Sequence, residues 1–118
     1  MKEFHVASRE TTKGKKRVFV DIDETICFYK DSNHRRYDLA IPSQLNIDKI
    51  NSLYDNNWEV TYWTARGSVS GKDYTEFTRD QLIGWGCKFD NLITGTTSPA
   101  KPHFDMVIDD KAKRIEEL

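Results

Sequence analysis

The stretch that decides the fold is residues 17–25, RVFVDIDET, an apolar run that ends in two carboxylates one residue apart. Its apolar members are β-branched or aromatic, which predicts a buried parallel strand. Side chains on an extended chain repeat every two residues, so Asp21 and Asp23 leave this strand on the same side. Because an unpaired buried charge costs several kcal/mol, we expect both acids to face a cleft at the carboxyl end of the strand.

The composition predicts one small domain, residues 1–118, with a single core. A formal net charge of −1 argues against stable nucleic-acid binding, because nucleic-acid binders usually carry a basic excess. The two cysteines, Cys27 and Cys87, have neither metal-type nor disulfide spacing, and no apolar stretch reaches the length of a membrane span. These features predict a cytoplasmic protein without a membrane partner.

Helical and strand patterns alternate along the rest of the chain. Residues 1–16 hold few apolar side chains and are expected to form a mobile tail or a short edge strand. Residues 26–42 have no clean period, which favours a loop or a small hairpin flap beside the two acids. Apolar spacing predicts helices over 42–55, 73–83 and 111–118, and strand formers occupy 58–64, 89–94 and 104–108. The alternation indicates an α/β, Rossmann-like fold with a parallel sheet and helices on both faces.

Polar residues follow the ends of three of these strands. In chain order they are Asp21 and Asp23, then Thr64, then Asp109 and Asp110, with Lys101 just before the last strand. Because parallel strands present all their carboxyl ends at one edge of a sheet, we expect these residues to converge there. Crowded carboxylates need a cation, and hard oxygen ligands suit Mg²⁺, which often takes substrate phosphate as a further ligand. The set therefore predicts a phosphoryl-transfer site, with a lysine and a threonine serving the other phosphate oxygens.

The same residues resemble the four motifs of the haloacid dehalogenase superfamily of phosphohydrolases. Residues 21–25, DIDET, look like its D-x-D-x-T signature, and the apolar run ending at Thr64 is similar to its second motif. Lys101 resembles the third-motif lysine, and Asp109-Asp110 the fourth-motif acid pair. The resemblance extends over about residues 17–111, and the compact ending is similar to small bacterial and phage members linked to capsule or sugar-phosphate metabolism.

This resemblance implies a Mg²⁺-dependent phosphatase that works through an aspartyl-phosphate. Asp21 would be the nucleophile, and Asp23 would protonate the leaving oxygen and then deprotonate the attacking water. Thr64 and Lys101 would hold the phosphoryl oxygens. The implied magnesium ligands are the Asp21 carboxylate, the backbone carbonyl of Asp23, Asp109, and Asp110 directly or through water.

One spacing departs from the family pattern. Many members have a helix between the lysine and the last acid pair, whereas only residues 102–108 separate Lys101 from Asp109 here. Lys72 and Lys111 are therefore competing candidates for the third-motif lysine.

Short spacings between the motifs leave no room for the cap domain that many members insert, so we expect a capless enzyme with an open site. An open site admits a phosphorylated macromolecule, whereas a homo-oligomer whose neighbouring subunit covers the site would favour small sugar phosphates. Arg66 and the Arg35-Arg36 pair are candidates for contacting the substrate, although exposed charge is the commoner explanation for each.

Two other classes of protein fit the sequence less well. A phosphorelay receiver has its acid pair first and its Lys-Pro nearly last, whereas Lys101-Pro102 precedes Asp109-Asp110 here. A non-catalytic phosphate-binding protein would not need every chemical residue type that this chain carries. Transfer to an acceptor other than water stays open, although the absence of a cap favours hydrolysis.

Overall fold

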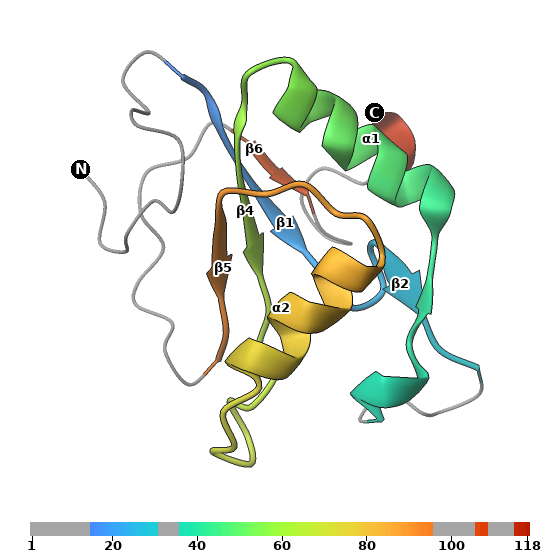
Figure 1. The fold of residues 1–118 in the computed structure, drawn as a ribbon, viewed down its shortest axis with the longest axis vertical. Coiled ribbons are helices and arrows are strands. Elements are labelled where there is room, and N and C mark those ends of the chain that lie inside the picture. Colours follow the sequence, from blue (N-terminus) through green and yellow to red (C-terminus); the bar gives the residue numbers. More distant parts are fainter. Residues whose placement is uncertain (1–14, 31–35, 96–105, 109–114) are drawn as a thin grey trace.

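The computed structural model describes residues 15–30, 36–95, 106–108 and 115–118. A four-stranded sheet lies at the centre of the structure (Figure 1). Its strands are β1 (Arg17–Asp21), β4 (Glu59–Trp63), β5 (Asn91–Ile93) and β6 (Met106–Ile108), in the order β5-β4-β1-β6. All three pairings are parallel, which confirms the predicted α/β fold.

Strand β1 is an interior strand of this sheet, paired with β4 on one side and β6 on the other. Its residues Val18, Phe19 and Val20 are at most 1% exposed. A strand covered on both faces needs apolar side chains at consecutive positions rather than at alternate ones. The consecutive apolar residues of β1 therefore explain why this strand lies in the interior of the sheet.

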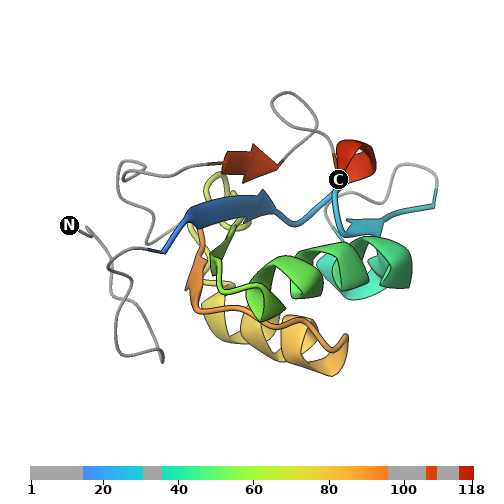
Figure 2. The ribbon, with the colours of Figure 1, turned by 90° about the horizontal axis from the view of Figure 1, so that it is seen from above.

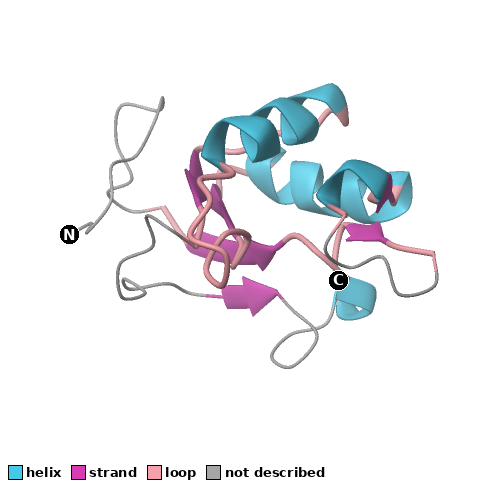
Figure 3. Ribbon diagram, turned by 90° about the horizontal axis from the view of Figure 1, so that it is seen from below, coloured by secondary structure: helices cyan, strands magenta, loops and turns pink. Residues whose placement is uncertain are grey.

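Two α-helices, α1 (Gln44–Asp55) and α2 (Thr75–Gly84), lie on the same side of the sheet, as Figures 2 and 3 show. Val18 and Val20 of β1 form one buried cluster with Ile47 and Ile50 of α1 and Leu82 of α2. We predicted helices on both faces of the sheet, but the two α-helices within the described residues lie on the same face. Most of the predicted closing helix over 111–118 lies outside the described residues, which include only a 3₁₀ turn, η2 (Ile115–Glu117).

A small flap follows β1, as predicted. Strands β2 (Cys27–Phe28) and β3 (Ile41–Pro42) pair in antiparallel fashion, and a 3₁₀ turn, η1 (Tyr37–Leu39), precedes β3. The described residues between Thr25 and Thr64 form only this flap, α1 and β4, which leaves them without a cap domain. Within the described ranges, every helix is too short or too polar to cross a membrane.

Burial predicts a sharp contrast in stability between two aliphatic residues of α1. Ile50 is fully buried, whereas Leu45 is 68% exposed. Ile50→Ala should lower the free energy of unfolding by about 2–5 kcal/mol, because it removes packed atoms and leaves a cavity. Leu45→Ala should change it by about 0.5 kcal/mol or less. Urea unfolding of both variants measures the difference, and equal losses would contradict the packing of α1 against the sheet.

Candidate functional site

The carboxyl ends of three neighbouring strands bring the first candidate residues to one edge of the sheet. Asp21 is the last residue of β1 and lies opposite Trp63, the last residue of β4. Val20 lies opposite Ile108, the last residue of β6. The chain therefore leaves β4 into Thr64 beside the end of β1, as the motif spacing predicted.

A tight turn after β1 positions Asp23. The carbonyl of Ile22 accepts a hydrogen bond from Thr25 N at 3.1 Å, and Glu24 N donates to the carbonyl of Cys27 at 2.9 Å. Glu24 has a φ of 66°, a left-handed conformation that side chains other than glycine adopt at a cost of about 1–3 kcal/mol. The turn brings Cys27 back beside Asp23 in a β-bridge.

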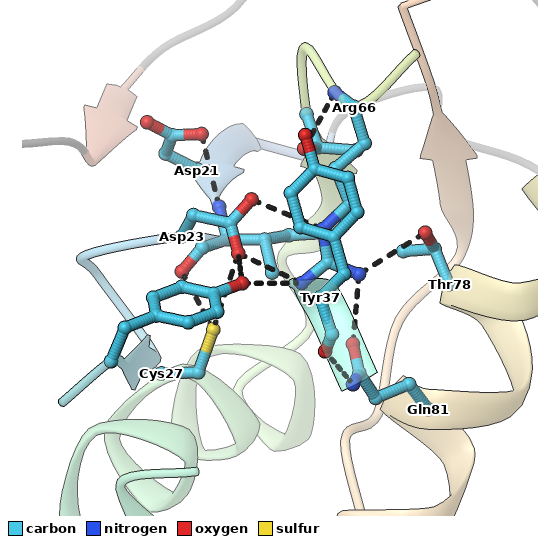
Figure 4. Close-up of polar contacts among 10 residues, drawn as sticks. Asp21, Asp23, Cys27, Tyr37, Arg66, Thr78 and Gln81 are labelled. Atoms are coloured by element: carbon cyan, nitrogen blue, oxygen red, sulfur yellow. Dashed lines mark hydrogen bonds and ion pairs between the residues drawn. The ribbon is translucent and has the colours of Figure 1, made fainter. Parts of the chain in front are cut away.

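Asp23 is held by a buried arginine, as Figure 4 shows. The Arg66 side chain is 0% exposed and that of Asp23 is 25% exposed. Arg66 Nη2 donates to Asp23 Oδ1 at 2.8 Å, and Nε donates to Oδ2 at 3.0 Å. Tyr29 OH and Cys27 Sγ also contact Oδ1. A two-point pair of this kind adds geometric specificity to the attraction between the charges, so it fixes the orientation of the Asp23 carboxyl group.

Arg66 is itself anchored to helix α2 and to the flap. Its Nη1 donates to Thr78 Oγ1 at 3.3 Å and to Gln81 Oε1 at 2.8 Å. The guanidinium carbon lies 4.6 Å from the centre of the Tyr37 ring, a cation–π contact. Gln81 Nε2 donates to the backbone carbonyl of Tyr37 at 2.8 Å. One side chain thus joins the turn after β1, the turn η1 and helix α2.

The protonation states of this cluster follow from burial and from Asp23. Burial alone lowers the pKa of Arg66, but its hydrogen bonds and charge interaction with Asp23 raise that pKa above the ordinary value. Burial raises the pKa of Tyr29, and its hydrogen bond to Asp23 raises it further. Burial and the Asp23 charge also raise the pKa of the Cys27 thiol. Arg66 is therefore a cation and Tyr29 a neutral donor, and Cys27 has no thiolate character at neutral pH.

Thr64 lies one residue beyond β4 and is buried. Its backbone N–H donates to the carbonyl of Ile93 at 2.9 Å, and its Oγ1 accepts from the backbone N–H of Arg66 at 3.2 Å. A hydroxyl that accepts one hydrogen bond can still donate another. The position is therefore compatible with donation to an oxygen at the edge of the sheet.

Several predicted residues fall outside the described part of the chain, namely Lys101, Asp109, Asp110, Lys111 and Arg35. Lys72 is exposed, and its ammonium lies 5.1 Å from the centre of the Tyr74 ring. Within the described ranges, no three His, Cys, Asp or Glu side chains are grouped so as to hold a metal ion. Asp21 and the carbonyl of Asp23 nevertheless offer the oxygen atoms that Mg²⁺ prefers, and Asp109 is the residue after β6 in the sequence.

In the part of the chain that the structure describes, two cavities share the rings of Tyr37 and Tyr74. Those rings contact each other edge to face, with their centres 5.0 Å apart. The smaller cavity, of about 110 Å³, includes Ala65 and Gly67, the neighbours of Arg66. The larger, of about 310 Å³, is lined by Arg36, Tyr37, Asp38, Lys72, Asp73, Tyr74 and Phe77.

The sequence did not indicate the partners of the Asp23 and Arg66 pair. A flap beside the two acids was predicted, but no local pattern indicated that its residues Tyr29 and Tyr37 would contact Asp23 and Arg66. Thr78 carried one usable signal, since it lies four residues before Leu82 and thus on the inward stripe of α2. A polar residue on an inward stripe indicates a buried polar partner.

Comparison with known proteins supports the fold. No family model matches the chain, and no curated protein matches it. A crystal structure of an MCSG target from Vibrio cholerae is similar, with a TM-score of 0.62 and 21% sequence identity. The similarity covers 86% of this chain and 85% of that one. At this identity the likeness shows a shared fold.

Proposed function

We propose that this protein is a phosphatase that hydrolyses a phosphomonoester through an aspartyl-phosphate on Asp21. The observation that supports it best is the meeting of Asp21, Asp23 and Thr64 at the carboxyl edge of a parallel sheet. Open α/β sheets bind their ligands at that edge. The four motifs that resemble the haloacid dehalogenase superfamily assign the same residues to phosphoryl transfer.

Each step uses a group of this chain. An Asp21 oxygen attacks the phosphorus while the bond to the leaving oxygen breaks, and Asp23 gives its proton to that oxygen. Water then attacks the phosphorus of the aspartyl-phosphate and passes a proton to Asp23, which restores both carboxyl groups. The hydroxyl of Thr64 donates to a phosphoryl oxygen, and Lys101 is the candidate for a second oxygen.

Mg²⁺ is the cofactor of this proposal. The Asp21 carboxylate and the Asp23 carbonyl would hold it, together with Asp109 and with Asp110 in support. When bound, the ion offsets negative charge on the phosphoryl oxygens and on the carboxylates. All of these candidate ligands offer oxygen atoms, which is the ligand type that Mg²⁺ takes in proteins.

We assign the substrate part beyond the phosphate to the larger cavity, whose Tyr37 ring contacts the Arg66 guanidinium. The larger cavity, at about 310 Å³, has the size of a small-molecule site, which typically occupies about 300–1,000 Å³. Its aromatic residues Tyr37, Tyr74 and Phe77 suit the apolar face of a ring, and its charged residues include the ion pair of Arg36 with Asp38. This favours a small phosphomonoester such as a sugar phosphate over a phosphorylated macromolecule.

A phosphate-release screen with and without metal tests the proposal. Sugar phosphates, nucleotides, nucleic-acid ends, phosphopeptides and p-nitrophenyl phosphate are supplied with Mg²⁺ or with excess chelator. We expect release of inorganic phosphate from at least one class with Mg²⁺, and a loss of about 100-fold or more with chelator, because uncompensated carboxylates repel the phosphoryl group. Re-addition of Mg²⁺ should restore the rate. Phosphate binding without release would instead identify a phosphate-binding protein.

A further inference from the structure

The five N–H groups of the Arg66 side chain are matched by five acceptor contacts. Nε and Nη2 donate to Oδ2 and Oδ1 of Asp23, respectively. The second hydrogen of Nη2 points to Tyr29 OH, with an Nη2–oxygen distance of 3.4 Å. Nη1 donates hydrogen bonds to Thr78 Oγ1 and Gln81 Oε1. A guanidinium has five N–H donors and no acceptor, so none remains for a phosphoryl oxygen. With a side chain that is 0% exposed, Arg66 is built to act on Asp23 rather than on substrate.

The two carboxylate oxygens of Asp23 differ in how many hydrogen-bond donors contact them. Oδ1 contacts three donors, on Arg66, Tyr29 and Cys27, and each carboxylate oxygen has only two lone pairs. Among the residues that the structure describes, Oδ2 accepts one hydrogen bond, from Arg66 Nε. Figure 4 shows that Oδ2 is the oxygen turned toward Asp21. The Asp23 side chain is 25% exposed, and Oδ2 is its oxygen with fewer donors among the described residues.

We propose that Arg66 is the positioning residue that fixes Asp23 so that Oδ2 carries the proton exchanged with substrate and water. This inference rests on the proposed function. The proton on Oδ2 passes to the leaving oxygen as the P–O bond breaks, and the resulting carboxylate stays paired with Arg66. In the second half, water loses a proton to Oδ2 while its oxygen attacks the phosphorus of the aspartyl-phosphate. Tyr37, Thr78 and Gln81 hold Arg66 in turn.

The dependence of kcat/KM on the leaving group distinguishes a positioning role of Arg66 from a role in substrate binding and from a purely structural role. The ratio kcat/KM reports the steps up to transfer onto Asp21, and p-nitrophenolate departs without a proton whereas an alkoxide needs one. Arg66→Met should lower kcat/KM for glycerol phosphate by about 100-fold, the size expected for a misplaced catalytic group. For p-nitrophenyl phosphate the loss should be about threefold or less. Arg66→Lys should recover part of the loss.

Two further variants keep this test informative. Arg79→Met removes an exposed arginine from α2, the helix that anchors Arg66, and should leave the rates with both substrates unaffected. Gln81→Leu removes one anchor of Arg66 and should reproduce the selective loss more weakly, even where Arg66→Met fails to fold. Equal losses on the two substrates in the Arg66 and Gln81 variants would overturn the positioning role. An active Asp21→Asn variant would instead overturn the proposed function, whatever the Arg66 variants show.

Discussion

Asp21→Asn should abolish phosphate release, with a loss on the order of 10⁴-fold or more in kcat. An amide in place of the carboxylate removes the oxygen that would attack phosphorus and weakens the proposed metal site. The fold should survive, because Asn retains a side-chain oxygen to accept the hydrogen bond that Ile22 N donates to Asp21 Oδ1 at 3.0 Å. Steady-state phosphate release and a thermal unfolding curve together measure the two effects.

Asp80→Asn is the matched control for this variant. Asp80 is an exposed carboxylate on helix α2. It should keep full activity under the same conditions. If Asp21→Asn keeps activity comparable with that of Asp80→Asn, then the nucleophile is another group and the proposed mechanism fails.

Asp23→Asn should lower kcat by about 10²–10⁴-fold, the usual contribution of a positioned acid or base. The effect should differ between the two halves of the reaction. Transfer from p-nitrophenyl phosphate to Asp21 needs no acid, so kcat/KM for that substrate should change little. Hydrolysis of the aspartyl-phosphate needs the base, so the phosphorylated protein should accumulate. A rapid-quench experiment should therefore show a burst of p-nitrophenolate, followed by slow steady-state release.

The same substitution should destabilise the protein. Replacing the partner of a buried cation typically costs about 3–5 kcal/mol, since Arg66 would remain charged and fully buried. Urea unfolding of Asp23→Asn measures this cost and shows that the variant is folded when its kinetics are recorded. Unaltered turnover in a folded Asp23→Asn protein would remove Asp23 from the chemistry.

Local patterns were sufficient to predict most of the fold. The apolar run before Asp21, the helical spacing over 42–55 and the strand formers over 58–64 correspond to β1, α1 and β4. Each of these signals depends on residues close together in the sequence. The side of the sheet that a helix covers depends on distant packing, and the described helices share one face where both faces were expected.

Arg66 shows why the site was only partly predictable. An arginine in a polar turn after a strand is usually exposed, and the sequence offered it as a substrate contact. Its burial depends on Asp23 in the turn after β1 and on Thr78 and Gln81 of helix α2, two segments that are far apart in the sequence. A charged residue becomes a core residue only when its partners are brought together by the whole fold. Conversely, Asp21 and Thr64 could be placed from sequence because strand ends share one edge by geometry.

The most direct test of the proposed chemistry is to locate the phosphoryl group on the protein. Asp23→Asn is incubated with Mg²⁺ and p-nitrophenyl phosphate, quenched in acid, and examined by intact mass and by peptide sequencing after reduction of the acyl phosphate with borohydride. We expect a single added phosphoryl group, with reduction confined to Asp21. A phosphoryl group on another residue, or its absence while phosphate is still released, would contradict the mechanism.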